Sequence, residues 1–252
     1  MTQSPPTHRR GRPRRGLASV AGVFGELLIT AGVFVFLFLG WQLWLNDLIV
    51  GDEQRSEAIA FGRELGTAAQ PQAPATPTAG FGEPVVAAPS ADTVRFANIY
   101  VPRFGGDYVR TIAEGVGAAD VLQSGVGHYP DTQMPGEVGN FAVAAHRTTY
   151  GAPFNRIAEL VVGDRIFVQT ADGWYTYVFR STEYVLPTGI GVLEPVPQAP
   201  GAAATERLIT MTSCNPLLSS AERIIAYGVL DQWQPASAGP PEELAALGLG
   251  GA

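Results

Sequence analysis

Residues 164–186, "DRIFVQTADGWYTYVFRSTEYVL", contain two runs rich in β-branched and aromatic residues on either side of a short polar segment. Such runs are typical of β-strands. The dipeptide Asp172-Gly173 between them suits a tight turn with positive backbone angles. The stretch therefore predicts a β-hairpin.

Similar runs recur on both sides of this hairpin, separated by turn residues. Seven or more strands within residues 93–234, with few helices, favour an all-β fold, either a closed barrel or a sandwich. Residues 118–125 and 153–161 are the only short helical candidates. The expected strands lie within residues 94–104, 107–116, 139–148, 164–170, 174–186, 207–214 and 223–230.

The N-terminal region has a different character. Residues 27–45 form an uncharged, mostly apolar run of nineteen residues, which is long enough to cross a hydrocarbon core of roughly 30 Å. A buried core helix and a cleaved signal peptide are the alternatives. The run is apolar on every face and no clear small-residue cleavage site follows it, so we predict a single transmembrane helix.

Charge is distributed unevenly around this helix. Five of the sixteen arginines precede it, and all acidic residues but Glu26 follow it. The positive-inside rule then places residues 1–26 in the cytoplasm and the residues after Asn46 outside the cell. A short arginine cluster beside a membrane helix is a topology signal that contacts anionic lipid, so we expect no nucleic-acid partner.

The segments that flank the β-rich region bury little. Residues 46–65 carry charges at helical spacing and are expected to form a stalk, and residues 66–92 are rich in Ala, Pro, Thr and Gly. Residues 46–92 are therefore interpreted as a stalk and a Pro/Ala-rich linker. Residues 235–252 are expected to form a flexible C-terminal tail.

Three residue types at the ends of separate expected strands point to acyl-transfer chemistry. Cys214 is the only cysteine in the chain, His146 ends one strand and Arg223 begins another. A thiolate nucleophile needs a nearby imidazole and donors for the oxyanion, and Cys, His and Arg supply these roles. Each residue alone also fits a structural role: a packed thiol, a hydrogen-bonded loop imidazole or a surface charge.

Other chemistry is not indicated by the sequence. There is no Gly-x-Ser-x-Gly motif, no Gly-rich phosphate loop before a helix, and no Cys/His pair with metal-ligand spacing. His8 lies in the basic tail and His128 lies in an expected turn. We therefore expect neither a metal nor a cofactor.

Four segments resemble sequences typical of one enzyme family, the sortases. "NFAVAAHRTTYGAPF" (140–154) resembles the catalytic-histidine segment, and "TMTSCNP" (210–216) resembles the Thr-Leu-x-Thr-Cys signature. "ERIIAYGVL" (222–230) resembles the strand with the catalytic arginine, and "YPDTQMPGEVGN" (129–140) the approach to the histidine strand. The resemblance covers residues 93–234 and is greatest to class E sortases of high-GC Gram-positive bacteria.

The resemblance implies a closed eight-stranded β-barrel with one or two short helices, and a membrane-anchored cysteine transpeptidase. Cys214 would attack the Thr–Gly bond of a Leu-Ala-x-Thr-Gly-like sorting signal, His146 would act as acid and then base, and Arg223 would hold substrate and oxyanion. The implied partners are surface proteins that carry the signal and an amine of a cell-wall precursor.

Two further residues are expected to contact the substrate. The phenol oxygen of Tyr129 is a suitable acceptor for the backbone N–H that Ala, unlike Pro, offers in the signal. Ser213 keeps a hydroxyl at the position before the cysteine. A pilin-polymerising sortase, a plain cysteine peptidase and a non-catalytic membrane-anchored β-barrel that binds a partner are the alternative readings.

Overall fold

The computed structural model describes residues 15–41, 46–68 and 81–250. These residues fall into two compact units, divided between residues 45 and 46. Several expected features lie outside the described residues: most of the basic tail (1–14), the end of the expected membrane helix (42–45), the middle of the linker (69–80) and the last two residues of the tail (251–252).

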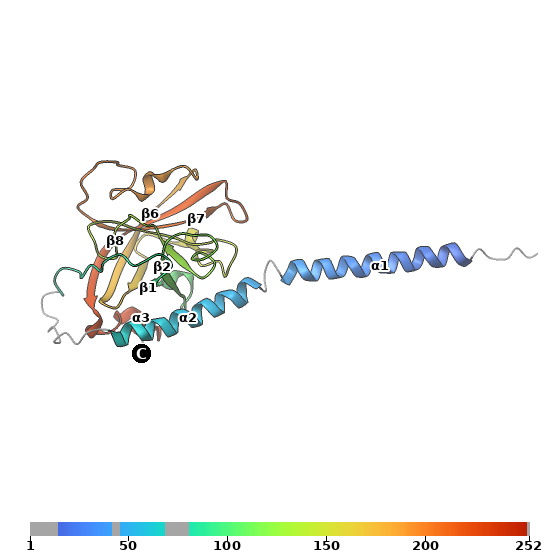
Figure 1. Ribbon diagram of the computed structural model, residues 1–252, viewed down its shortest axis with the longest axis horizontal. Coiled ribbons are helices and arrows are strands. Elements are labelled where there is room, and N and C mark those ends of the chain that lie inside the picture. Colours follow the sequence, from blue (N-terminus) through green and yellow to red (C-terminus); the bar gives the residue numbers. More distant parts are fainter. Residues whose placement is uncertain (1–14, 42–45, 69–80, 251–252) are drawn as a thin grey trace, which may run out of the picture. The chain divides into compact units, whose positions relative to one another are not determined.

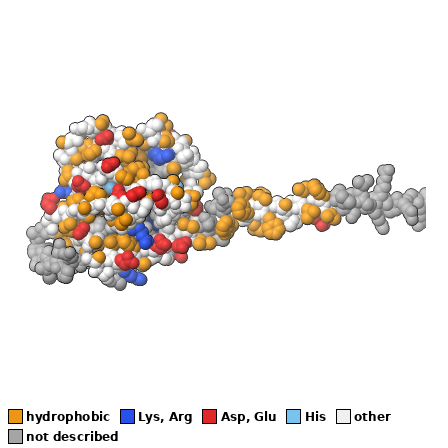
Figure 2. Space-filling model, in the orientation of Figure 1, with side chains coloured by type: hydrophobic (Ala, Val, Ile, Leu, Met, Phe, Trp, Pro, Cys, Tyr) orange, Lys and Arg blue, Asp and Glu red, His pale blue; other side chains and the backbone are white. Residues whose placement is uncertain are grey.

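The first unit contains helix α1, Arg15–Gly40. Its segment Gly22–Gly40 has 19 residues with a mean hydropathy of 2.2, which is sufficient to cross a membrane by length and composition. Hydrophobic side chains cover the described part of α1 in Figure 2. Because this segment begins at Gly22, it starts before the predicted boundary at residue 27.

The second unit is built on a closed barrel of eight strands in the order β1-β2-β3-β4-β7-β8-β6-β5, which confirms the predicted all-β barrel (Figure 1). Two pairs, β2–β3 and β4–β7, are parallel and the others are antiparallel. The strands are β1 Arg95–Tyr100, β2 Val109–Glu114, β3 Val126–His128, β4 Gly139–Ala144, β5 Arg165–Gln169, β6 Gly173–Val185, β7 Arg207–Asn215 and β8 Glu222–Pro235.

The predicted hairpin is β5–β6, in which Gln169 pairs with Trp174. The prediction of positive backbone angles at its turn is wrong, since neither Asp172 nor Gly173 has a positive φ. Glycine is required there for another reason: a Cβ on Gly173 would lie 2.3 Å from the backbone oxygen of Gln234 in β8. Close approach of a neighbouring strand therefore explains this glycine.

Strand β3 was expected as a turn. Three residues are too few to show a strand pattern, and β3 forms by pairing with β2 on one side and β4 on the other. Residues 118–125 form turns instead of a helix, and residues 153–161 contain only the 3-10 turn Ile157–Glu159. Further 3-10 turns in the described residues are Pro102–Phe104, Ile190–Leu193 and Ala236–Ala238.

The main core fills the barrel and follows the two-residue period of its strands. On three neighbouring strands, alternate residues point inward and are buried. These inward residues are Phe141 and Val143 of β4, Ile209 and Met211 of β7, and Ile224 and Ala226 of β8. The residues between them therefore point to the outer face of the barrel.

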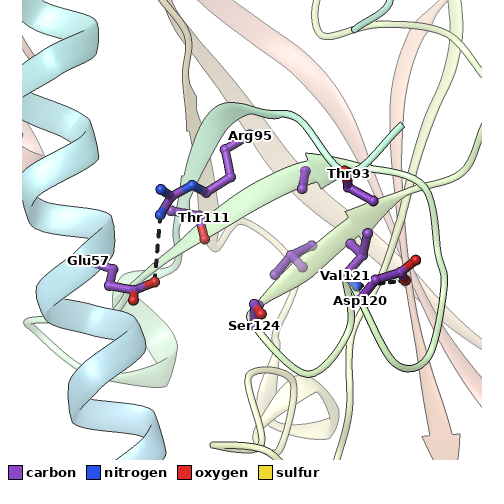
Figure 3. A pocket seen from close by; sticks show the side chains of 10 residues that line it. Glu57, Thr93, Arg95, Thr111, Asp120, Val121 and Ser124 are labelled. Atoms are coloured by element: carbon purple, nitrogen blue, oxygen red, sulfur yellow. Dashed lines mark hydrogen bonds and ion pairs between the residues drawn. The ribbon is translucent and has the colours of Figure 1, made fainter. Parts of the chain in front are cut away.

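Helix α2, Asn46–Ala68, packs against the barrel instead of forming a free stalk. The buried amide of Asn98 in β1 donates a 2.7 Å hydrogen bond to the backbone oxygen of Ala58. Glu57 reaches Arg95 at 3.6 Å beside a cavity of about 220 Å³. Figure 3 shows these two side chains pointing toward each other. The charged spacing of this segment predicted a helix, but small residues such as Ala58 allow it to dock.

The expected flexible tail also packs on the barrel. Helix α3, Glu242–Ala246, lies near α2 in Figure 1, and its Leu244 is fully buried. A second hydrophobic cluster, outside the barrel, consists of Ala58, Tyr100, Val109, Phe167, Trp174, Leu244 and Leu249. The apolar side chains of the tail therefore complete a core to which α2 also contributes.

The C-terminal end of the expected linker is bound to the barrel by hydrogen bonds. The indole N–H of Trp233 donates a 3.3 Å hydrogen bond to the backbone oxygen of Phe81, and the hydroxyl of Tyr175 donates to the backbone oxygen of Val85. Phe81 packs against the main core. The part of the linker that follows residue 80 therefore lies on the barrel surface.

Candidate active site

Strand register brings the three candidate catalytic residues to one end of the barrel. Cys214 in β7 pairs directly with Arg223 in β8. In the parallel pair β4–β7, Ala144 pairs with Thr212, so His146 and Cys214 each lie two residues beyond that pair. Paired residues on neighbouring strands point to the same face. All three positions lie on the outward-facing register.

Cys214 is a free, half-buried thiol near the end of β7. Residues 216–218, which follow the strand, are exposed, and Leu218 is 82% exposed. The thiol therefore lies near the end of its strand, beside an exposed turn.

His146 follows β4 directly. The N–H of Ala145 donates a 3.2 Å hydrogen bond to the backbone oxygen of Thr212, which continues the β4–β7 pairing up to the histidine. The ring of His146 is half-buried, and burial lowers its pKa, while the negative charge of Asp47 raises it. Its Nε2 atom is buried and has no hydrogen-bond partner among the described residues.

Arg223 is half-buried at the start of β8. Its Nη1 donates hydrogen bonds to the backbone oxygens of Ser220 (3.0 Å), in the β7–β8 turn, and Glu222 (2.9 Å), the first residue of β8. These bonds orient the guanidinium relative to the turn that follows Cys214. Because the group is a planar fork with several donors, one side can be fixed while another binds an oxygen.

Arg147 was not singled out from the sequence, although it follows His146 directly. It is 7% exposed, and its Nη1 donates to the backbone oxygen of Cys214 at 3.2 Å and to the side-chain oxygen of Asn215. Asn155 donates a 2.8 Å hydrogen bond to the backbone oxygen of Arg147. This arginine therefore connects residues 147–156, the histidine loop, to the backbone of Cys214.

Tyr129 lies after β3, and its hydroxyl is 3.0 Å from Oγ1 of Thr212. Thr212 precedes Cys214 by two residues in β7, so both residues point to the outer face of the barrel. The phenol oxygen is thus next to the cysteine strand on the outer face. Sequence reasoning did not single out Thr212. Its position two residues before Cys214 in an expected strand places both on one face, and this spacing could have identified it.

Ser213 has the opposite orientation. It is 3% exposed, and its hydroxyl donates a 2.8 Å hydrogen bond to the backbone oxygen of Ala145. Alternation along β7 places it on the inward side with Met211. This placement does not fit the expected contact with substrate and instead favours a role in joining β7 to the residue before His146.

His128 belongs to a different cluster. Its ring is 1% exposed, with Nδ1 at 2.8 Å from a carboxylate oxygen of Glu114, and Nε2 at 2.9 Å from the hydroxyl of Thr132 and 3.1 Å from the backbone oxygen of Gln133. Both ring nitrogens are occupied. This ring therefore joins β2, β3 and the following turn and has no nitrogen available for a substrate.

The described residues offer no metal centre, and two cavities lie away from the candidate catalytic residues. No group of three or more His, Cys, Asp or Glu side chains in the described part of the chain is arranged to hold a metal ion. Two cavities, of about 220 and 370 Å³, have linings that do not include Cys214, His146 or Arg223. The three candidate residues lie at strand ends, outside both of these cavities.

Comparison with known proteins identifies the family of the chain. A family model described as the sortase domain matches residues 99–231, which include Cys214, His146 and Arg223. The chain belongs to the sortase family. Sortases are cysteine transpeptidases. The family match includes β2 to β7 entirely, the last two residues of β1 and all but the last four residues of β8.

Two sortases of Streptomyces coelicolor are similar over most of this sortase chain. Sortase SrtE1 is 35% identical over 94% of this chain and 65% of its own length. Sortase SrtE2 is 31% identical over 93% of this chain and 92% of its own length. The resemblance to class E sortases is thereby supported by relatives that bear the E designation.

A solved structure shows the same fold. The crystal structure of sortase E1 from Streptomyces coelicolor, with a tripeptide in its active site, aligns with a TM-score of 0.56 and 37% identity. The alignment covers 60% of this chain and 97% of the other. The barrel of this sortase therefore has the architecture of a class E relative.

Proposed function

We propose that this sortase is a membrane-anchored transpeptidase that cleaves a Leu-Ala-x-Thr-Gly-like sorting signal between Thr and Gly and joins the Thr carbonyl to a cell-wall amine. The observation that carries the proposal is the alignment of Cys214, His146 and Arg223 on three neighbouring strand positions. Sortases act on surface proteins that bear sorting signals, which gives the substrate class.

The reaction follows from the three side chains. The Cys214 thiolate attacks the Thr carbonyl carbon, and the resulting oxyanion accepts hydrogen bonds from Arg223. His146 protonates the Gly nitrogen as the C–N bond breaks, which leaves a thioester on Cys214. An incoming amine then attacks the thioester, His146 takes its proton, and the thiolate leaves as the new amide forms.

The proposed preference for Ala in the signal rests on Tyr129. Its hydroxyl lies beside Thr212 on the outer face that carries Cys214. A hydroxyl pair at this place offers an acceptor to a backbone N–H, which Ala has and Pro lacks. The tripeptide in the active site of sortase E1 is consistent with peptide binding in a relative.

The proposed location has the N-terminus in the cytoplasm, α1 across the cell membrane and the barrel outside the cell. It is supported by the apolar segment Gly22–Gly40 and by the arginines that precede it. Sorting signals of surface proteins are reached from that side of the membrane.

The test uses the full chain in detergent micelles, incubated with Leu-Ala-x-Thr-Gly and Leu-Pro-x-Thr-Gly peptides, with and without an added amine, and mass spectrometry of products. We expect a thioester on Cys214, release of the Gly fragment, and a ligated product only with amine. Hydrolysis alone, in the presence of amine, would indicate a peptidase. A protein amine as the only accepted nucleophile would indicate pilin polymerisation.

Two variants complete this test. Cys214→Ala should abolish cleavage. It should leave the melting temperature unchanged, because the half-buried thiol contributes little to the packing of the core. Tyr129→Phe should lower the cleavage rate of the Ala-containing peptide by about tenfold, which corresponds to the loss of one hydrogen bond. The cleavage rate of the Pro-containing peptide should not change. Cleavage by Cys214→Ala within tenfold of the wild-type rate would show that Cys214 is not the nucleophile.

A further inference from the structure

One end of helix α2 contacts the loop that follows His146. The buried side chain of Gln54 donates hydrogen bonds to the backbone oxygens of Tyr150 (2.9 Å) and Gln123 (3.0 Å). The N–H of Gly151 donates to a carboxylate oxygen of Asp47 at 3.4 Å. Two residues of α2 therefore hold two consecutive residues of the histidine loop.

The contact depends on Gly151. A Cβ on Gly151 would lie 2.9 Å from both the backbone N and the Cα of Gly51 in α2. This distance is shorter than side chains allow, so the loop approaches the helix this closely only because residue 151 has no side chain.

The loop has an unusual backbone. Three consecutive residues have positive φ angles: Tyr150 at 51°, Gly151 at 74° and Ala152 at 43°. Residues with a Cβ rarely adopt this region and do so only where surrounding contacts enforce it. The hydrogen bonds from Gln54 and to Asp47 fall on the first two of these three residues, so α2 supplies contacts that enforce the conformation.

The conformation of this loop determines what lies against the histidine ring. The ring of Tyr150 packs on the ring of His146, with centroids 5.1 Å apart and an interplanar angle of 40°. Since Nε2 of His146 has no hydrogen-bond partner among the described residues, the ring orientation depends on packing of this kind.

We propose that α2 is a positioning element for His146, and that Gln54 is the positioning residue that acts through Tyr150. This inference rests on the proposed function for the role of His146 in catalysis. It adds that the helix directly after the membrane segment is part of the catalytic apparatus. Loss of the Gln54 hydrogen bonds releases the Tyr150 ring and allows His146 to leave its productive orientation.

The test is Gln54→Met in the full chain in detergent micelles. Met keeps the length of the side chain and removes both donors, and the Gln54 oxygen that is lost has no partner among the described residues. We expect kcat to fall by about tenfold, since small misplacements of a catalytic group have effects of this size or larger. KM for the peptide should change less than about twofold, because the substrate-binding face is untouched.

The matched control is Asn98→Leu, which removes a buried amide that donates to α2 at the backbone of Ala58. Its side-chain oxygen also lacks a partner in the described structure. It should lower the melting temperature by as much as Gln54→Met and leave kcat unchanged. Equal losses of kcat in both variants would overturn the proposal, because they would trace the effect to helix docking in general.

A second readout is independent of catalysis. The NMR signals of the His146 ring, assigned with a His146→Gln variant, should shift in Gln54→Met as the Tyr150 ring moves away, and should stay in place in Asn98→Leu. Unchanged His146 signals in Gln54→Met would overturn the proposal even if no peptide is cleaved. A wild-type protein with no activity would reject the proposed function and leave this structural test decisive.

Discussion

The guanidinium of Arg147 donates a hydrogen bond of 3.2 Å to the backbone oxygen of Cys214. It also donates to Asn215, whose amide donates to Glu222 at 3.0 Å. A buried arginine next to the candidate acid-base residue thus fixes the backbone of the candidate nucleophile. The separation of the two groups is set by this side chain as well as by the β4–β7 register.

Arg147→Lys should lower kcat by about tenfold with little change in KM, because an ammonium cannot bridge two acceptors with the fixed geometry of a guanidinium. The measurement is steady-state peptide cleavage. Arg156→Lys is the control, since exposed Arg156 also donates to a backbone oxygen, that of Phe104. Wild-type kcat in Arg147→Lys would show that strand register alone positions Cys214.

The two histidines of the barrel should respond in opposite ways to substitution. His146→Ala should lose about 10²–10⁴-fold in kcat, the usual contribution of acid-base catalysis, with a nearly unchanged melting temperature. His128→Ala should instead lose about 3–5 kcal/mol of unfolding free energy, because it leaves Glu114 buried without its partner. Kinetics and denaturation of both variants check this, and the reverse pattern would exchange their roles.

Arg223→Lys separates charge from geometry. Lysine keeps the positive charge and loses the fork that binds the β7–β8 turn and one further oxygen at the same time. We expect kcat/KM to fall by about 10²-fold, the loss typical of one oxyanion donor. Near-normal kcat/KM in cleavage assays would reduce Arg223 to a general positive charge near the thiol.

The pKa of His146 is open to direct measurement. Burial lowers it and Asp47 raises it, so Asp47→Asn should lower it further. Because the folded-state pKa lies below the ordinary value of about 6.5, the folded chain binds fewer protons than the unfolded chain near that pH. This contribution to stability is fully present above a pH of about 6.5, the unfolded-state pKa. It is lost as the pH falls from there through the lower pKa of the folded state.

NMR titration of the His146 ring in both proteins checks the shift. The difference in melting temperature between wild type and His146→Ala, followed from neutral to acidic pH, checks the sign of the stability effect. A higher pKa in Asp47→Asn would show that Asp47 does not act on the ring through its charge.

The C-terminal tail contributes to stability through one leucine. Leu244 is fully buried against Trp174 and Tyr100. Leu244→Ala should cost about 2–4 kcal/mol of unfolding free energy, since it leaves a cavity in the second cluster. Leu247→Ala, at a side chain that is 43% exposed, should change the free energy by no more than about 0.5 kcal/mol. Equal effects in chemical denaturation would indicate a tail that does not pack on the barrel.

Local patterns in the sequence determined the class of fold. Alternating apolar residues and turn dipeptides marked seven strands that the barrel contains, and an uncharged apolar run marked the membrane-type helix. The site residues Cys214, His146 and Arg223 were found from their chemistry and from motifs, and their roles stay predictions. These signals are readable because each one is contained within a few consecutive residues.

Only the tertiary structure decided the rest. Strand β3 exists because two neighbours pair with it, and Ser213 faces inward because the parity of β7 turns it away from Cys214. Helix α2 docks through Gln54, whose partner Tyr150 lies 96 residues away in the sequence. Contacts over such separations leave no local pattern in either segment, since burial, hydrogen bonding and close packing depend on what the folded chain brings alongside.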